Sequence, residues 1–495
     1  MVMSISRRHF IRNASATALA FSGLRQLTAH AQVYAVDPQR GIDPFGQLYQ
    51  DPAGIVNLPA GFRYTIISRT GDKMSDGLIT PSAPDGMAAF PMSGDNNRCI
   101  LVRNHELDSI GEEIDAFGGD LRLARERAGT KAYDYFNELP VNGGTTSLVY
   151  NMHTGRVEQA HLSLIGTARN CAGGATPWGS WLTCEETLVD KAQGFGREHG
   201  YVFEVDAQYR GLSEPVPLKD MGRFVHEAAA VDSTTGIVYL TEDYDRSLFY
   251  RFIPDQPGAL HRGGRLQALT IRGWHAANTR NYPEDVKKNT ADSTAKPIAI
   301  GDHFECEWID LKDVTAPDGD LSQRGEAQGA AIFSRCEGVA FALREAAKRE
   351  VFFAATGGGA KKLGQIWKYE PSPFEGTPRE REKPATLELF YESQDRAHME
   401  SCDNITVAPW GDLIICEDSY SADPTMVNYL RGLTPQGKIY TLAMNAHPAK
   451  GEFCGACFSP DGTTLFVNIQ RPGMTLAITG PWGSLRHSAR DVAFT

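Results

Sequence analysis

Short apolar segments that end in two adjacent acids recur along this chain. They occupy residues 181–186, 238–243 and 413–418. Segments with a similar apolar run but altered ends occupy residues 100–106, 351–356 and 465–470. Short runs of apolar and β-branched residues, bounded by turn residues, predict buried β-strands. The pattern therefore predicts six related strands.

A second element precedes each of these strands. It opens with a polar residue or a cysteine and continues through small residues into another apolar run. Turns typical of hairpins close two of these runs, at residues 232–236 and 459–462. The step from Glu185 to Glu242 is 57 residues, which suits one propeller blade with its loops. The six opening residues are Asp85, Cys171, Glu227, Glu337, Asp403 and Cys454.

Six strand pairs of this kind predict an all-β fold, a six-bladed β-propeller with short helical and loop insertions. We expect a helical insertion at about residues 108–139, between the first two blades. A longer insertion, rich in glycine, aspartate and charge, is expected at about residues 254–324. Residues 32–495, including these insertions, are expected to form one domain.

The opening residues should gather at one place in such a fold. The innermost strand of every blade starts at the same end of the central channel, so these residues should ring one mouth of it. A following antiparallel strand would bring Glu185, Glu242 and Glu417 to the same mouth. Carboxylates crowded around one axis repel one another unless cations neutralise them, which predicts a metal site. The alternative is that the acids are turn residues that face water.

The donor types indicate which metals would bind. Carboxylate oxygens suit calcium or another hard cation. The thiolate of Cys171 does not suit calcium and indicates a transition metal such as iron. The alternative for Cys171 is a small buried residue beside Gly173 and Gly174.

A cation accompanies the predicted ring. Arg335 lies two residues before Glu337, so on an extended strand both side chains would point to one side. A guanidinium beside a carboxylate-rich metal site is a common means of holding phosphate oxygens, although a charge-balancing ion pair fits equally. The nucleophile and zinc motifs of other hydrolases are absent from the sequence, which leaves metal-assisted hydrolysis.

Charge and the N-terminus limit the possible partners. The net charge of −12 and the lack of any basic run exclude nucleic acid and anionic lipid as expected partners. Residues 1–31 combine paired arginines, a short apolar run and a small-x-small cleavage pattern, which predicts a twin-arginine signal peptide. Its four arginines leave with it, so the mature chain carries −16. We expect a periplasmic or secreted protein, exported by the twin-arginine translocase and without stable membrane insertion.

The nine cysteines all follow this leader. Their odd number predicts at least one free thiol or metal ligand in a compartment that favours disulfides. Cys454 and Cys457 have the spacing of a zinc half-site, but without a second pair nearby a core location is the better interpretation.

Residues 170–186, which read Asn-Cys-Ala-Gly-Gly-Ala-Thr-Pro-Trp-Gly-Ser-Trp-Leu-Thr-Cys-Glu-Glu, resemble the signature of PhoX-type alkaline phosphatases. Further motifs of that family follow in order at residues 222–227, 335–338, 356–359, 364–367, 416–418 and 458–470. The resemblance covers nearly the whole mature chain.

This resemblance implies a six-bladed propeller whose channel holds a cluster of Ca²⁺ and Fe³⁺ ions and hydrolyses small phosphomonoesters. It implies that Cys171 binds iron, that Glu227 and Glu337 are glutamate ligands of the cluster, and that Arg335 binds the phosphate. The ring argued above adds Asp85 and Asp403 as metal ligands. The implied calcium ligands lie among Glu185, Glu186, Glu242, Asp243, Glu417 and Asp418.

Two other functions fit the predicted architecture. Calcium-dependent lactonases and esterases are also six-bladed propellers with acidic ligands in the channel, and they need no thiolate. A non-catalytic binding propeller would use its ion only to hold the blades together.

Overall fold

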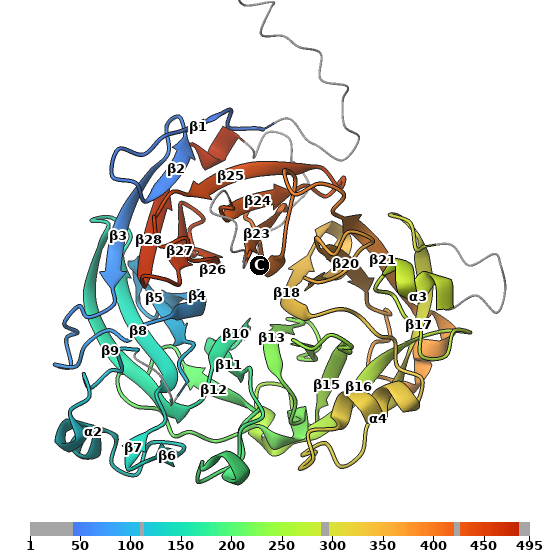
Figure 1. The fold of residues 1–495 in the computed structure, drawn as a ribbon, viewed down its shortest axis with the longest axis horizontal. Coiled ribbons are helices and arrows are strands. Elements are labelled where there is room, and N and C mark those ends of the chain that lie inside the picture. Colours follow the sequence, from blue (N-terminus) through green and yellow to red (C-terminus); the bar gives the residue numbers. More distant parts are fainter. Residues whose placement is uncertain (1–42, 109–112, 289–296, 420–425, 485–495) are drawn as a thin grey trace, which may run out of the picture. The chain divides into compact units, whose positions relative to one another are not determined.

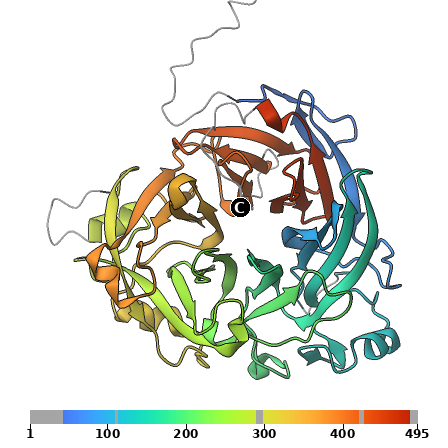
Figure 2. The same cartoon turned by 180° about the vertical axis from the view of Figure 1, so that it is seen from behind.

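The computed structural model describes residues 43–108, 113–288, 297–419 and 426–484 of the protein. The predicted leader, residues 1–31, lies outside the described residues. From residue 43 onward, antiparallel strands form sheets around a central space, and helices are few (Figure 1; Figure 2 shows the opposite side). The prediction of an all-β, propeller-like fold is confirmed.

Three sheets have three or four strands each. The strands in hydrogen-bonded order are β4 (Pro84–Met92), β5 (Asp95–His105), β8 (Gly143–Asn151) and β9 (Arg156–Thr167); β10 (Asn170–Ala175), β11 (Ser180–Glu185) and β12 (Val202–Asp206); and β26 (Phe453–Phe458), β27 (Thr464–Ile469), β28 (Met474–Thr479) and β3 (Arg63–Arg69).

Two sheets are larger. The strands of the first are β22 (Cys402–Val407), β23 (Leu413–Glu417), β24 (Tyr429–Leu433), β25 (Ile439–Asn445), β2 (Val56–Pro59) and β1 (Leu48–Tyr49). The strands of the second are β13 (His226–Val231), β14 (Val238–Glu242), β15 (Tyr250–Pro254), β16 (Gly264–Ile271), β17 (His303–Asp310), β21 (Ala385–Glu392), β20 (Gln365–Glu370), β19 (Arg349–Ala355) and β18 (Cys336–Leu343).

The nine-stranded sheet departs from the expected six separate blades. Strand β17, which lies in the segment predicted as an insertion, pairs with β16 on one side and with β21 on the other. The backbone of β17 forms hydrogen bonds with the outermost strand of each of two four-stranded units, so the two units become one sheet. The strand repeats themselves are confirmed, because all six are strands: β5, β11, β14, β19, β23 and β27.

The strands that precede these repeats form the inner wall of the fold. Each contacts the next around a closed ring, in the order β4, β10, β13, β18, β22 and β26 (Figure 1). They line a central cavity of about 700 Å³ with mainly small side chains. The two predicted hairpin turns are confirmed, with Gly236 and Gly462 each donating a backbone hydrogen bond across its turn at 2.8 Å.

Glycine allows the inner strands to approach one another closely. A Cβ atom on Gly338 would lie 2.4 Å from the carbonyl oxygen of Asp403 on the next strand. A Cβ atom on Gly86 would lie 2.6 Å from the Cα of Ala172. Any larger residue would push the neighbouring strand outward, so these glycines fix how tightly the heads of the inner strands converge.

Helices and a small hairpin occupy the outside of the sheets. Helix α2 (Leu121–Ala128) and the hairpin β6 (Tyr135–Phe136) and β7 (Leu139–Pro140) lie between β5 and β8 in the chain, and α3 (Pro283–Lys288) and α4 (Leu321–Ala327) flank β17. Short 3-10 helices occur at Lys191–Gln193, Lys219–Met221, Leu260–Arg262, Glu345–Ala347, Pro378–Glu382 and Trp482–Ser484. None of the helices described for this chain has the length and apolar character that crossing a membrane requires.

Candidate metal centre

β-Bulges at the heads of the inner strands determine where the opening residues point. Asp85, Cys171, Glu227, Glu337 and Asp403 each lie at the first position of a bulge, where two residues face one on the partner strand. A bulge breaks the ladder and redirects a side chain. In β26 the bulge comes one residue later, at Gly455 and Ala456, so Cys454 is the last regularly paired residue.

The two acids at the end of each repeated strand point in different directions. Glu185 accepts hydrogen bonds from the ring of His199 and the backbone of Ala168, at 2.6 and 2.9 Å. Glu242 accepts one from the Tyr250 hydroxyl at 2.8 Å, and Glu417 one from Arg431 at 2.8 Å. The first acid of each pair is therefore hydrogen-bonded to the surrounding protein and belongs to no cluster of ligand atoms among the described residues, contrary to the expectation that all three reach the channel mouth.

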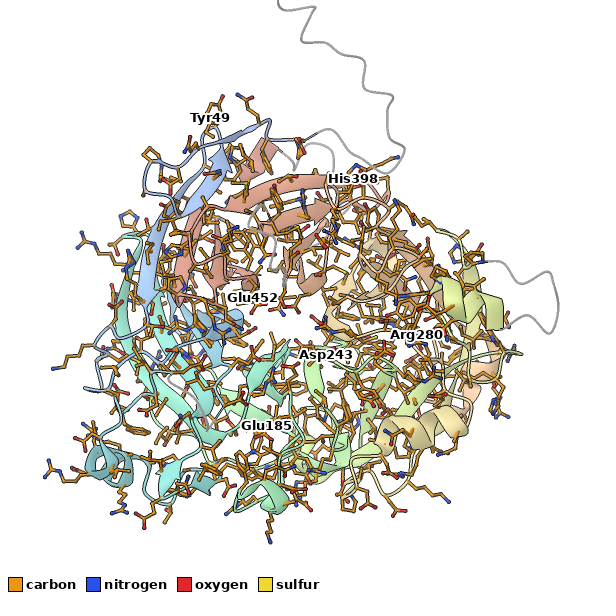
Figure 3. All side chains as sticks on the ribbon, viewed as in Figure 1. Tyr49, Glu185, Asp243, Arg280, His398 and Glu452 are labelled. Atoms are coloured by element: carbon orange, nitrogen blue, oxygen red, sulfur yellow. The ribbon has the colours of Figure 1, made fainter. Side chains whose placement is uncertain are left out.

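The second acids lie with the opening residues. The side chains of neighbouring residues in a strand point to opposite faces. Because the side chain of Glu185 points away from the centre, that of Glu186 points toward it. Figure 3 shows Asp243 beside the central space and Glu185 farther out. Glu186, Cys171 and Glu227 offer ligand atoms within 4.8 Å of one another, and so do Asp418, Asp403 and Glu452.

The donors form a continuous band. Two more groups that meet the 4.8 Å criterion are Asp85 with Glu106 and Cys171, and Asp85 with Glu452 and Cys454. The thiol of Cys171 also lies 3.3 Å from Oε1 of Glu227. Because the groups share members, the band runs unbroken from Glu227 to Asp403.

Burial makes this band electrostatically unfavourable without cations. Burial and then the neighbouring carboxylates raise the pKa values of Asp85, Glu227, Glu337 and Glu452 well above their ordinary range. Burial likewise raises the pKa of Asp403 to about 6 and, together with the charge of Asp403, that of Asp418 to about 7. The chain has concentrated carboxylates where water cannot screen them.

Asp85 shows directly that the centre suits a cation. Its side chain is buried, and Oδ1 has no hydrogen-bond partner among the described residues. Oδ2 accepts a hydrogen bond from Gln470 at 2.7 Å, and the same amide nitrogen donates to Glu106 at 2.6 Å. A buried carboxylate oxygen without a donor is costly unless a cation occupies the space beside it. Oxygen donors with a thiol among them fit a mixed hard and soft metal set.

Arg335 lies at the edge of the band. Its Nη2 is 2.6 Å from Oε1 of Glu337, and its Nε and Nη2 lie 3.0 and 3.2 Å from the two oxygens of Asp243. The side chain is 45% exposed, and Nη1 has no hydrogen-bond partner in the described part of the chain. Arg335 precedes β18 in the left-handed conformation, with φ of 49°, and not in the extended one expected. The guanidinium can therefore offer a donor outward while two acids hold it.

Three charged residues of the band were not among the candidates from the sequence. Glu106 ends the altered repeat at residues 100–106, and Glu452 precedes β26 by one residue. Figure 3 shows Glu452 beside the central space. Arg169 has a left-handed backbone, like Arg335, and its Nη2 contacts Glu106 and Glu186 at 2.8 and 3.0 Å. The sequence contained a signal for Arg169, because this residue precedes Cys171 by two positions, as Arg335 precedes Glu337.

The contact between Glu185 and His199 leads to a prediction about the stability of the protein. His199 is fully buried between Glu185 and Asp134, at 2.6 and 3.2 Å. Burial alone would lower its pKa, but these two carboxylates raise the pKa of His199 to about 9. The resulting stabilisation of the folded state is complete below pH 6.5, which is near the pKa of histidine in the unfolded chain, and it is lost as the pH rises through about 9. It contributes at most about 3 kcal/mol to the free energy of unfolding.

We expect His199→Gln to remove this pH dependence. Between pH 6.5 and 9 the wild type should lose free energy of unfolding relative to the variant, as measured by denaturant titration at matched metal content. His303→Gln alters an exposed histidine and serves as the control. Parallel pH profiles for wild type and His199→Gln would show that the buried histidine is neutral.

The nine cysteines are all unpaired and buried. The prediction of at least one free thiol is confirmed. Cys171 and Cys454 belong to the band of donors, whereas Cys457 packs in a core cluster with Cys99. Of these two cysteines, only Cys457 has the core location that the sequence indicated, and Cys454 lies in the band.

Comparisons with known proteins identify a family and a similar fold. The family model of Alkaline phosphatase PhoX matches residues 43–473. PhoX of Pseudomonas fluorescens, solved in complex with vanadate, a transition state analogue, shares 18% sequence identity and superposes with a TM-score of 0.63 over 86% of this chain and 96% of that one.

A gluconolactonase of Xanthomonas campestris is 11% identical and has a TM-score of 0.38, over 86% of this chain and 99% of that one. No curated protein sequence matches this chain. The match of the family model spans most of the chain, including every residue of the band. The chain belongs to the alkaline phosphatase PhoX family.

Proposed function

We propose that this protein is a metal-dependent alkaline phosphatase that hydrolyses small phosphomonoesters at the mouth of its channel. The observation that carries the proposal is Arg335, an exposed guanidinium held by two acids at the rim of a buried carboxylate band. Such a guanidinium can bind the non-bridging oxygens of a phosphate group, and the carboxylates of the band would hold the cations that polarise those oxygens.

We propose Ca²⁺ and Fe³⁺ as the bound ions. Asp85, Cys171, Glu186, Glu227, Glu337, Asp403 and Asp418 supply the ligands, with Asp243 holding Arg335. When bound, the cations supply the positive charge that polarises the phosphoryl oxygens and lowers the pKa of a bound water. The unpartnered Oδ1 of Asp85 and the thiol of Cys171 support a mixed hard and soft set.

Residues of this chain position the phosphate ester. Arg335 clamps the phosphoryl oxygens as their negative charge rearranges, and Glu337 and Asp243 keep its fork fixed. The ester group extends outward, on the side where the Arg335 side chain is exposed. Arg169, across the band, provides a second positive charge near the same mouth.

We further propose six blades, with the nine-stranded sheet counted as two blades that share β17. The closed ring of six inner strands supports this count. We propose that residues 1–31 direct the folded chain through the twin-arginine translocase to the periplasm or the exterior. The paired arginines at the start of the sequence support the route.

The test is a comparison of substrates. The exported, metal-loaded protein is assayed with a chromogenic phosphomonoester and with a lactone at alkaline pH. We expect phosphate release and no lactone opening. Lactone turnover without phosphate release would contradict the proposal in favour of a lactonase, and neither activity in metal-loaded protein would favour a binding propeller.

A further inference from the structure

Arg169 and Arg335 occupy equivalent positions at the heads of two inner strands. Each stands directly before its strand, Arg169 before β10 and Arg335 before β18, and each has a left-handed backbone, with φ of 47° and 49°. In the ring of inner strands the order is β10, β13 and β18. The residue at the corresponding position before Glu227 of β13 is Val225, which carries no charge. Two guanidinium groups therefore flank the head of β13.

Two acids connect these arginines. Nη2 of Arg169 lies 3.0 Å from Oε2 of Glu186, and Nε of Arg335 lies 3.0 Å from Oδ1 of Asp243. The side chains of Glu186 and Asp243 are hydrogen-bonded to each other. The contacts fix both guanidinium groups and place two carboxylates between them. A phosphoryl group on Arg335 therefore leaves Arg169 available to another part of the same substrate.

Arg169 has a donor available for a ligand. Its contacts with Glu106 and Glu186 both use Nη2, and Nη1 has no hydrogen-bond partner in the part of the chain that the structure describes. The side chain is 38% exposed, close to the 45% of Arg335. A guanidinium that is fixed on one edge and open on the other is suited to carboxylate or phosphate oxygens.

The side of the mouth beside Arg169 contains a further cation. Burial raises the pKa of the Asp108 carboxyl, and the charges of Arg169 and Arg471 counteract this rise, so both arginines lie near Asp108. The side chain of Arg471 is 57% exposed. Glu106 and Glu186, which hold Arg169, belong to the groups that would bind cations, so their charge is offset in the loaded centre. An anion on this side would meet two guanidinium groups.

We propose that Arg169 binds a second anionic group of the substrate, so that the preferred substrates are phosphomonoesters whose alcohol part carries a carboxylate or a further phosphoryl group. This inference rests on the phosphatase function proposed above, in which Arg335 holds the phosphoryl group that is cleaved. The second group is bound equally in the substrate and in the transition state, so Arg169 selects substrates through KM and takes no part in bond breaking.

The test compares three esters on one preparation of the exported, metal-loaded protein: phenyl phosphate, 3-carboxyphenyl phosphate and 3-phosphonophenyl phosphate. The two charged esters distinguish carboxylate from phosphoryl recognition. We expect kcat/KM for at least one of them to exceed that for phenyl phosphate by roughly tenfold, as a charge-assisted hydrogen bond provides. Arg169→Gln should reduce this ratio to about one. A ratio measured on one preparation does not depend on the fraction of chains that hold metal.

Two variants and a binding measurement serve as controls. Arg169→Lys keeps the charge but not the fork, so it should retain part of the preference. Arg265→Gln removes an exposed arginine of β16 that pairs with Asp310, and it should retain all of the preference. Calorimetric titration with phenylphosphonate and 3-carboxyphenylphosphonate, which are not hydrolysed, should show the same order of affinities without turnover.

The outcomes separate this inference from the function on which it rests. Equal kcat/KM for the three esters in the wild type, or a preference that survives in Arg169→Gln, would overturn the inference and leave the phosphatase function standing. An equal loss for all three esters in Arg169→Gln would also overturn it, because Arg169 would then hold the cleaved phosphoryl group together with Arg335. No phosphate release from phenyl phosphate in the wild type would contradict the proposed function, and the inference with it.

Discussion

Replacement of Arg335 by alanine will lower the turnover number for a phosphomonoester by roughly a hundredfold or more, which corresponds to a few kcal/mol of transition-state stabilisation. The reason is that the guanidinium is held by Glu337 and Asp243 and still offers a free donor outward. Its charge meets phosphoryl oxygens whose negative charge changes during the reaction. The measurement is steady-state kinetics on protein whose metal content has been verified.

Two variants distinguish phosphate binding from charge balance. Arg335→Lys keeps the positive charge but not the fork, so it should recover only part of the activity. Arg272→Ala removes an exposed arginine that pairs with Glu305 and Glu307 far from the band, and its kinetics should equal those of the wild type. Unchanged turnover in Arg335→Ala, accompanied by lower metal content or stability, would assign Arg335 to charge balance alone.

Removal of the metals will abolish activity and lower the melting temperature, and the loss of stability will grow as pH rises. Buried carboxylates with raised pKa values bind more protons in the folded state than in the unfolded state, so stability falls as pH rises from about 4 through the folded values. For Asp403 and Asp418 these are about 6 and 7. The measurement is thermal unfolding of chelated and metal-loaded protein across this range.

Asp403→Asn provides a matched variant for that experiment. It removes one charge from the band and keeps the size of the side chain. We expect it to stabilise the chelated protein at neutral pH, because repulsion falls, and to destabilise the loaded protein, because a ligand is lost. A variant that is less stable in both states would indicate that Asp403 has only a structural role.

The repeats made much of the fold and part of the centre predictable. Six similar strands, each preceded by an opening residue, predicted the ring of inner strands and brought Asp85 and Glu227 together. Periodicity could not predict β17, whose pairing depends on the neighbouring sheet edges and not on its own sequence. It also could not predict the bulges, which are properties of the backbone after two strands have paired.

The sequence also could not predict which acid of each adjacent pair faces the centre. Glu185 and Glu186 are both strand-end acids in the sequence, and which of the two faces the centre depends on how β11 pairs with β10, where Glu185 is the partner of Asn170. Glu452 escaped prediction because it stands before its strand and not at a repeat end. Cys454 was aligned with the other opening residues, although the bulge in β26 follows it by one position.

The strands that close the ring also set an order of events during synthesis. Strand β3, near the start of the described chain, pairs only with β28, near its end, and β2 pairs with β25 as well as with β1. Glu452 and Cys454 reach the band from the last inner strand. A chain still on the ribosome therefore has unpaired N-terminal strands and an incomplete set of ligands. The set of ligand residues is complete only once β26 has been synthesised, so a chain truncated before Glu452 lacks two donors of the band.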